Sequence, residues 1–185
     1  ISYRLVGSEM CIRDSYIRCW ILLMSFHKPY KPEEYKSLIE NNFSEIWFQF
    51  LYFEVMRSRD CVRFMKNNPN GYLILQVISW HHGLVLLSEN KNQDRKNFVK
   101  SWEGSSKSKT KPNKKLTYSL VSELTGLSIE TIRRQVKKLI NERWVTYSKK
   151  EGIIYMPHID KAKEMTENLN PKEIDRFVNL LSNID

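Results

Sequence analysis

The chain has 185 residues, a net charge of +9 and only six glycines. That length suits one domain or two small ones and leaves room for a buried core. The three cysteines form no C-x-x-C pair and no cluster at metal-ligand spacing, which favours a reducing cytoplasm without disulfides. The sequence contains no Walker-type glycine loop, G-x-S-x-G or H-E-x-x-H motif, so we expect neither an enzyme nor a cofactor.

The positive charge is concentrated in one part of the chain. Residues 91–150 hold 16 of the 30 Lys and Arg residues and 5 of the 21 Asp and Glu residues, a net +11, whereas the remainder has a net −2. One explanation is a solvated charge run that keeps the protein in solution. The other is a polyanionic partner, which we favour because the charge coincides with the helical motif described below.

The first segment in chain order is interpreted as foreign to the protein. Ser8–Ser15 resembles the translation of a transposon-end adapter used in sequencing libraries, which indicates an environmental assembly as the source. Residues 1–27 are therefore predicted to be an artefact and a disordered start. The apolar run at 16–24 is too short to span a membrane, and no small-residue cleavage site follows it.

Residues 28–71 are predicted to form an N-terminal helical region that makes a homodimer. A short helix is expected at Glu33–Asn41, after Pro32, and a long one at Ser44–Lys66. The first half of the long helix is apolar nearly all round, so it is buried on more than one side. A domain core or a ligand pocket would also explain this pattern, the pocket being lined by Trp47, Phe50 and Phe53. We prefer a subunit interface, because a small chain offers few partners for every face.

A turn at Asn67–Gly71 and a buried helix at Tyr72–Leu87 are expected next. His81 and His82 in that helix are interpreted as half-exposed, and joint metal binding is not expected because adjacent residues point to different sides of a helix. A pH-sensing role is the remaining alternative for them.

Asn92–Glu103 predicts another short helix, which packs through its apolar residues. Residues 104–115 hold five lysines and no apolar residue, so we expect a mobile loop. This loop is either a plain linker or a contact for phosphate groups, and its lysines, Lys115 included, would then act through charge alone.

Residues 116–157 have the clearest pattern in the sequence. Thr117 and Ser128 can cap two helices, and Gly126 supplies the positive φ of a sharp turn between them. The second helix, 129–142, has an apolar stripe of Ile129, Ile132, Val136, Leu139 and Ile140. Two β-prone runs follow, Trp144–Ser148 and Ile153–Met156, and predict a hairpin whose loop carries two lysines.

This stretch resembles the winged helix-turn-helix domains of bacterial regulators, of both the cAMP-receptor/FNR type and the MarR type. The matching residues are Leu116-Thr117, Val121, Ser122, Leu124, Gly126-Leu127-Ser128, Glu130-Thr131-Ile132, Arg134 and Leu139, with the hairpin. The resemblance implies a mainly α fold, with a winged helix-turn-helix domain at 72–157, a small β-hairpin wing and flanking N- and C-terminal helices. Glycine usually follows the recognition helix in these families, but Arg143 stands there, so we expect this helix to end differently.

Residues 158–185 are predicted to be helical. A weak helical pattern at His158–Leu169 is followed by a final helix with Asn170 as its cap and Pro171 at its first position. Its apolar stripe consists of Ile174, Phe177, Val178 and Leu181. This tail resembles the C-terminal dimerisation helix of MarR-type regulators, which supports the prediction of a homodimer.

The sequence thus predicts a transcriptional regulator that binds double-stranded DNA as a cytoplasmic homodimer, with a small-molecule effector left open. Helix 129–142 would enter the major groove, and the wing at 144–156 would lie on the backbone or in the minor groove. The resemblance to the cAMP-receptor type supports Arg134 as the reader of a guanine edge and Glu130 as the acceptor from a cytosine amino group. The predicted DNA-binding residues are Thr117, Ser119, Ser128, Glu130, Thr131, Arg133, Arg134, Lys137, Lys138, Lys149 and Lys150.

Two alternatives use the same fold. The first is a replication-initiation or partition protein that acts on plasmid or phage DNA, and the second is a protein-interaction module that binds no DNA. Genomic neighbourhood would separate regulation from replication, whereas salt-dependent binding to random DNA would separate both from the interaction module.

Overall fold

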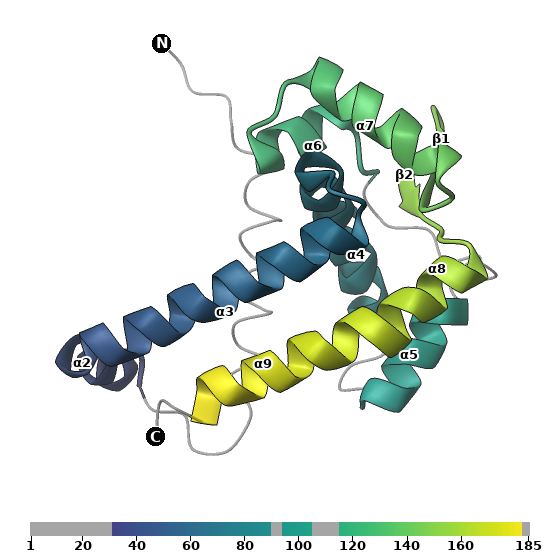
Figure 1. The fold of residues 1–185 in the computed structure, drawn as a ribbon. Helices are drawn as coiled ribbons and strands as arrows, with labels where there is room; N and C mark the ends of the chain where they lie inside the picture. Colours follow the sequence, from purple (N-terminus) through teal and green to yellow (C-terminus); the bar gives the residue numbers. More distant parts are fainter. Residues whose placement is uncertain (1–30, 90–93, 105–114, 183–185) are drawn as a thin grey trace, which may run out of the picture. The chain divides into compact units, whose positions relative to one another are not determined.

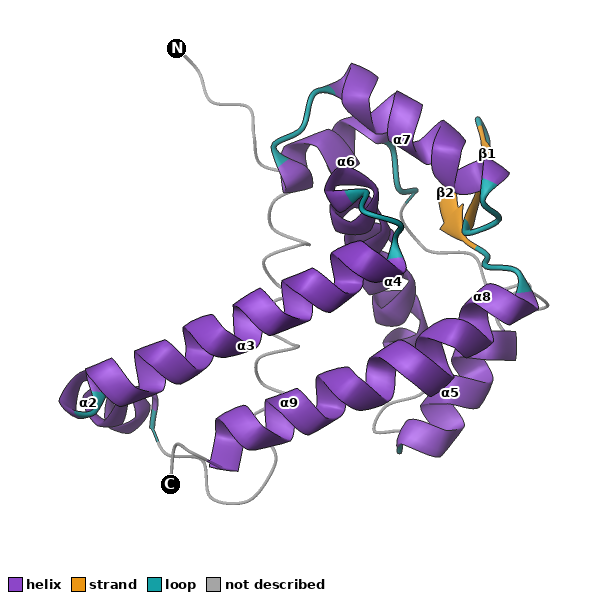
Figure 2. Cartoon of the chain, viewed as in Figure 1, coloured by secondary structure: helices purple, strands orange, loops and turns teal. Residues whose placement is uncertain are grey.

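The structure is a computed structural model that describes residues 31–89, 94–104 and 115–182. The chain divides into two compact units, Ile1–Phe48 and Gln49–Asp185. The described residues are mainly helical with one small antiparallel hairpin, which confirms the predicted mainly α class (Figures 1 and 2). The predictions for residues 1–27 and for the lysines at 107–114 lie outside the described residues.

The described part of the first unit consists of helix α2 (Pro32–Asn41) and the start of helix α3 (Phe43–Phe64). The amide of Lys31 donates a hydrogen bond to the Glu34 carboxylate (2.8 Å), which closes the first turn of α2. Ile46 is buried, and the rings of Phe43 and Trp47 stack at a centroid distance of 5.5 Å. Both N-terminal helices therefore lie within two residues of their predicted bounds.

The core of the second unit is enclosed by helix α4 (Pro69–Glu89), helix α6 (Tyr118–Thr125), helix α7 (Ile129–Asn141) and strands β1 (Val145–Ser148) and β2 (Gly152–Tyr155). Each element contributes side chains that are at most 2% exposed. They are Ile74, Leu75, Ile78, Val121, Ile132, Val136, Leu139, Val145, Ile153 and Tyr155, with Trp144 between α7 and β1.

Helix α4 begins earlier than the sequence indicated. Pro69–Gly71, predicted as part of a turn, form its first turn instead. The reason is Asn68, whose side-chain oxygen accepts a hydrogen bond from the amide of Gly71 (3.1 Å), as an N-cap does. Pro69 suits the first helical position because the missing N–H there would have no partner within the helix.

The C-terminal segment is one continuous helix with a wider turn in its middle, made of α8 (Ile159–Lys163), the π-helix η1 (Glu164–Leu169) and α9 (Asn170–Ser182). The prediction that Asn170 caps a separate helix is wrong, because its backbone is helical (φ −59°, ψ −40°). Pro171 has no N–H to donate, and the π turn lies directly before it. The guanidinium of Arg95 donates to the carbonyl oxygen of Thr166 (2.9 Å), five residues before Pro171. Arg95 begins helix α5 (Arg95–Gly104), which therefore supports the uninterrupted helix.

Helix α9 lies beside α3 (Figure 1), where ion pairs join the two helices and the rings of Phe53 and Phe177 lie 6.0 Å apart. Arg57 forms an ion pair with Glu173 (3.0 Å), and Asp60 forms one with Arg176 (2.5 Å). The hydrogen bond from Arg176 lowers the pKa of the Asp60 carboxyl. Cys61 is fully buried beside them, and burial raises the pKa of its thiol to about 11.

Across the described ranges, every helix falls short of the length or apolar character needed to cross a membrane.

Candidate nucleic-acid interface

Helices α6 and α7 are joined by the sharp turn that the sequence predicted. The side chain of Thr117 accepts a hydrogen bond from the amide of Leu120 (3.2 Å) and caps α6. Ser128 accepts one from the amide of Thr131 (3.2 Å) and caps α7. Gly126, with φ 71°, ends α6 in the left-handed conformation. Both predicted caps and the glycine turn are therefore confirmed.

Helix α7 has one fully buried face and one basic face. Ile132, Val136 and Leu139 have no exposed surface. With about 3.6 residues per turn, Arg134 lies opposite the centre of that buried stripe, and Lys137 and Lys138 flank it. We define the basic face as Arg133, Arg134, Lys137 and Lys138, all of which are exposed. The predicted amphipathic helix is confirmed at these three positions. The prediction is wrong for Ile129 and Ile140, which are 41% and 36% exposed, because they lie at the edge of the stripe, roughly 50–70° from its centre at 3.6 residues per turn.

Most of the predicted DNA-binding residues are open to solvent. Exposed among them are Ser119, Ser128, Glu130, Arg133, Arg134, Lys137, Lys138, Lys149 and Lys150, whereas Thr117 and Thr131 are half-buried. Glu130 forms an ion pair with Arg133 (3.6 Å) on the helix surface. An exposed pair of this kind contributes about 0–1 kcal/mol, so a new partner can displace it at little cost.

The hairpin follows α7 in the chain (Figure 1). Lys149 and Lys150 lie in the loop between its two strands. Gly152 has φ 80°, and a Cβ there would lie 2.4 Å from the carbonyl oxygen of Leu116. That carbonyl accepts a hydrogen bond from the amide of Ile153 (2.9 Å), so only glycine allows the chain to approach so closely. Residue 116 therefore anchors the hairpin to the segment before α6.

Lys115 does not behave as the loop lysine that the sequence predicted. Its ammonium group donates a hydrogen bond to the carbonyl oxygen of Lys149, at the tip of the hairpin. The prediction of a mobile segment is therefore wrong for this residue, whereas its action through charge alone stays a prediction. The structural reason is the pairing of Leu116 with Gly152, which brings Lys115 next to the hairpin loop.

The end of α7 also differs from the expectation. Arg143 adopts the left-handed conformation (φ 61°) that glycine usually occupies. The amide of Trp144 donates to the carbonyl of Leu139 (2.9 Å), and the amide of Arg143 donates to that of Ile140 (3.0 Å). These two bonds form a Schellman motif, and the buried side chains of Trp144 and Leu139 supply its apolar contact. The expectation that the helix ends differently is therefore wrong, because the motif tolerates arginine.

An aromatic cluster supports the hairpin from behind. The indole N–H of Trp102 on α5 donates to the hydroxyl of Tyr155 on β2 (3.2 Å), and the ring of His82 lies 5.2 Å from Trp102 and 5.4 Å from Tyr155. Burial lowers the pKa of His82 to about 4, with a smaller contribution from His81. The interpretation of His82 as half-exposed missed this packing. No three His, Cys, Asp or Glu side chains in the described residues lie close enough together to hold a metal ion.

Sequence reasoning also missed an aromatic pair at the front of the hairpin. The rings of Tyr118 on α6 and Tyr147 on β1 lie 4.8 Å apart. The available signal was the alternation of β1, which places Tyr147 on the same face as Val145.

No protein-family model, curated protein or solved structure matches this chain. What this surface can do therefore follows from its own geometry and charge.

Proposed function

We propose that this protein is a transcriptional regulator that binds double-stranded DNA as a cytoplasmic homodimer. Its α6–turn–α7 unit would be a helix-turn-helix, with α7 in the major groove and the hairpin as a wing on the backbone or in the minor groove. The observation that carries the proposal is the division of α7, whose inner face is fully buried while its outer face presents four basic side chains.

The charges of the basic face repel one another in the free protein. Arg133 and Lys137 are four residues apart, as are Arg134 and Lys138, and like charges at that spacing cost a helix about 0.2–0.5 kcal/mol per pair. The single acidic partner on this face, Glu130, offsets the charge of Arg133. Phosphate groups would relieve the remaining repulsion, which favours a polyanion over a neutral partner.

Individual residues would take different roles on the duplex. Arg134, at the centre of the basic face, would read a guanine edge through two hydrogen bonds, and Glu130 would accept from a cytosine amino group. Lys137 and Lys138 would contact phosphates, as would Lys149 and Lys150 from the wing. Thr117, Ser119, Ser128 and Thr131 lie at the starts of the two helices, where exposed N–H groups and hydroxyls suit phosphate oxygens.

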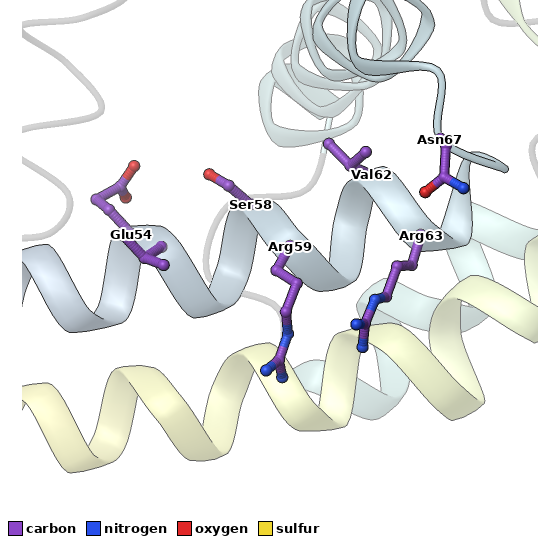
Figure 3. A pocket seen from close by; sticks show the side chains of 7 residues that line it. Glu54, Ser58, Arg59, Val62, Arg63 and Asn67 are labelled. Atoms are coloured by element: carbon purple, nitrogen blue, oxygen red, sulfur yellow. The ribbon is translucent and has the colours of Figure 1, made fainter.

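The homodimer is supported by apolar side chains that remain exposed on two helices. Tyr52 and Val55 of α3 are 62% and 64% exposed, and Val178 of α9 is 54% exposed. A hollow of about 530 Å³ lies beside α3. Among the side chains that line it, Arg59 and Arg63 point to one side and Glu54 to the other (Figure 3). Large apolar side chains that remain exposed on neighbouring helices favour an interface. A second copy of the chain fits it because the hollow offers both charges for reciprocal pairing.

The test of DNA binding is a salt titration by fluorescence anisotropy. Random-sequence duplexes are used first, and then a duplex obtained by selection from a random pool. We expect affinity to fall steeply with salt, and Arg134→Ala to weaken the selected duplex by roughly 1–3 kcal/mol while random DNA changes less. Lys172→Ala, which removes an exposed charge from α9, is the matched control and should change neither. A protein that binds no duplex at low salt would be an interaction module instead.

The test of the dimer is light scattering on the full chain at micromolar concentration. We expect twice the mass of one chain, and Val55→Asp should return it to the mass of a monomer while the helical circular dichroism is kept. Val55 is exposed, so this substitution has little reason to unfold the chain. A monomeric mass for the unchanged protein would contradict the dimer.

A further inference from the structure

One position on the inner face of the hairpin is left outside the core. Directly opposed residues in an antiparallel pair point to the same face, so Val145 and Tyr155 share a face with Tyr147 and Ile153. Three of these side chains are at most 2% exposed, whereas Tyr147 is 40% exposed. The core therefore ends before Tyr147, and a different contact must support the outer end of the hairpin.

That contact is Tyr118. It is the first residue of α6, and its ring lies against Tyr147 with an angle of 38° between the ring planes. Burial, and then the nearby Tyr147, raise the pKa of Tyr118, while Arg133 acts in the opposite direction. The charge of Arg133 therefore lies close to the pair, so one contact joins α6, the flank of α7 and the hairpin.

We propose that Tyr118 and Tyr147 are positioning residues for DNA binding, whose ring contact holds the hairpin tip where Lys149 and Lys150 meet the phosphates. This inference rests on the proposed function. Neither tyrosine needs to touch DNA, because the rings act through the two lysines.

The geometry of the hairpin makes its tip sensitive to this contact. Lys149 follows Tyr147 by two residues, or about 7 Å along an extended strand. An isolated two-stranded hairpin is marginally stable, so its supports determine where the tip lies. The other supports described near the tip come from the same short segment: the Leu116 carbonyl on the Ile153 amide, and the Lys115 ammonium on the Lys149 carbonyl. The third support is the ring contact of Tyr118 with Tyr147, which lies on β1 close to the hairpin loop.

A double-mutant cycle on the salt dependence of binding tests the inference. In the unchanged protein, Lys149→Ala with Lys150→Ala should lower the slope of log K against log salt by up to about 2, because each phosphate contact contributes about 0.9. Tyr147→Ala alone should lower the slope by most of that amount, although it removes no charge. Adding the two lysine substitutions to Tyr147→Ala should then change the slope by less than about 0.5. A tyrosine that only stabilised the fold would leave the full effect of the lysines in place.

Three variants sharpen the cycle. Tyr147→Phe keeps the ring contact and should behave as the unchanged protein, whereas a loss there would show that the hydroxyl touches DNA and would overturn the inference. Tyr118→Ala should reproduce Tyr147→Ala from the other side of the contact. Thr146→Ala changes the same strand on its opposite face and should leave the slope unchanged. If thermal melting shows Tyr147→Ala to be unfolded, Tyr147→Leu replaces it in the cycle.

The outcomes separate this inference from the function on which it rests. Additive effects of Tyr147→Ala and the two lysine substitutions would overturn the positioning role and leave DNA binding intact. Absence of salt-dependent binding by the unchanged protein would overturn both. Coupled effects, with Tyr147→Phe unchanged, would support the positioning role.

Discussion

The two helical regions of the second unit distribute their side chains in opposite ways. Around α6, α7 and the hairpin, the apolar side chains of the core are fully buried and charges face solvent, while apolar residues at the edge, such as Tyr147, are partly exposed. Between α3 and α9, charged groups lie inside as the pairs Arg57–Glu173 and Asp60–Arg176, beside one aromatic contact, while other large apolar residues remain exposed. The first region has the distribution usual for a folded domain, whereas the second has the distribution expected of helices that bind a further partner.

This difference shows which region is complete within one chain. Burying apolar surface stabilises a fold by roughly 25 cal/mol per Å², and the α6–α7 region already uses the apolar side chains of its core. The α3–α9 contact leaves large apolar side chains exposed, and the desolvation of its ion pairs offsets much of their attraction. Its stability should therefore depend on association, whereas that of the α6–α7 region should not.

The largest expected effect comes from truncating the same residue type in each region. Leu139→Ala, at a position with no exposed surface, should lower the free energy of unfolding by roughly 2–5 kcal/mol because it leaves a cavity. Leu181→Ala, at a position that is 50% exposed, should change it by less than about 0.5 kcal/mol in dilute protein. Urea denaturation followed by circular dichroism measures both. Equal costs would show that α9 is packed as tightly as α7.

The polar contact between α3 and α9 is the next test. Glu173→Gln removes the negative partner of Arg57, whose side chain is 28% exposed, and leaves a cation without its charge partner in a half-buried position. We expect a loss of about 1–3 kcal/mol in the free energy of unfolding, below the figure for a fully buried pair. Glu167→Gln, on the exposed surface of η1, is the control and should be neutral. A neutral Glu173→Gln would mean that water screens this pair completely.

The aromatic cluster behind the hairpin predicts a pH dependence of the α6–α7 region. The pKa of His82 is about 4 in the folded protein, below its usual 6.5, so the unfolded chain binds more protons between these values. Stability should therefore be fully present above about pH 6.5 and fall as the pH drops toward 4, by on the order of 1–2 kcal/mol because water still screens part of the ring. His82→Phe keeps an aromatic ring and removes the titration. Thermal melts at several pH values should show a flatter profile for this variant, and an identical profile would assign the pH dependence to other groups.

The features that could be predicted from the sequence depend on contacts between residues a few positions apart. Thr117, Ser128 and Gly126 act through bonds within one helical turn, so their roles were readable from local sequence. The helix start predicted at Asn170 and Pro171 was wrong because Arg95, which supports the continuous helix there, lies on another element, 75 residues before Asn170. The ring contact of Tyr118 with Tyr147 depends on the register of a hairpin against a helix start, which no local pattern specifies. Base recognition by Arg134 remains a prediction.

We expect the smallest effect from substitutions to glycine at two helix ends, one in each region. Arg143 after α7 and Lys66 after α3 both adopt a positive φ, 61° and 53°, and both precede an amide that bonds back to the last turn. The left-handed conformation costs a residue with a side chain roughly 1–2 kcal/mol, and glycine removes that cost while giving the unfolded chain more freedom. Arg143→Gly and Lys66→Gly should each therefore stabilise the protein by up to about 1 kcal/mol.

If Arg143 also lies near a phosphate, its removal should reduce the salt slope of DNA binding by about 0.9, whereas Lys66→Gly should leave the slope unchanged. Melting curves and salt titrations on the same two variants would thus show whether arginine is kept at this position for binding rather than for the fold. A stabilised Arg143→Gly with an unchanged slope would show that it is not.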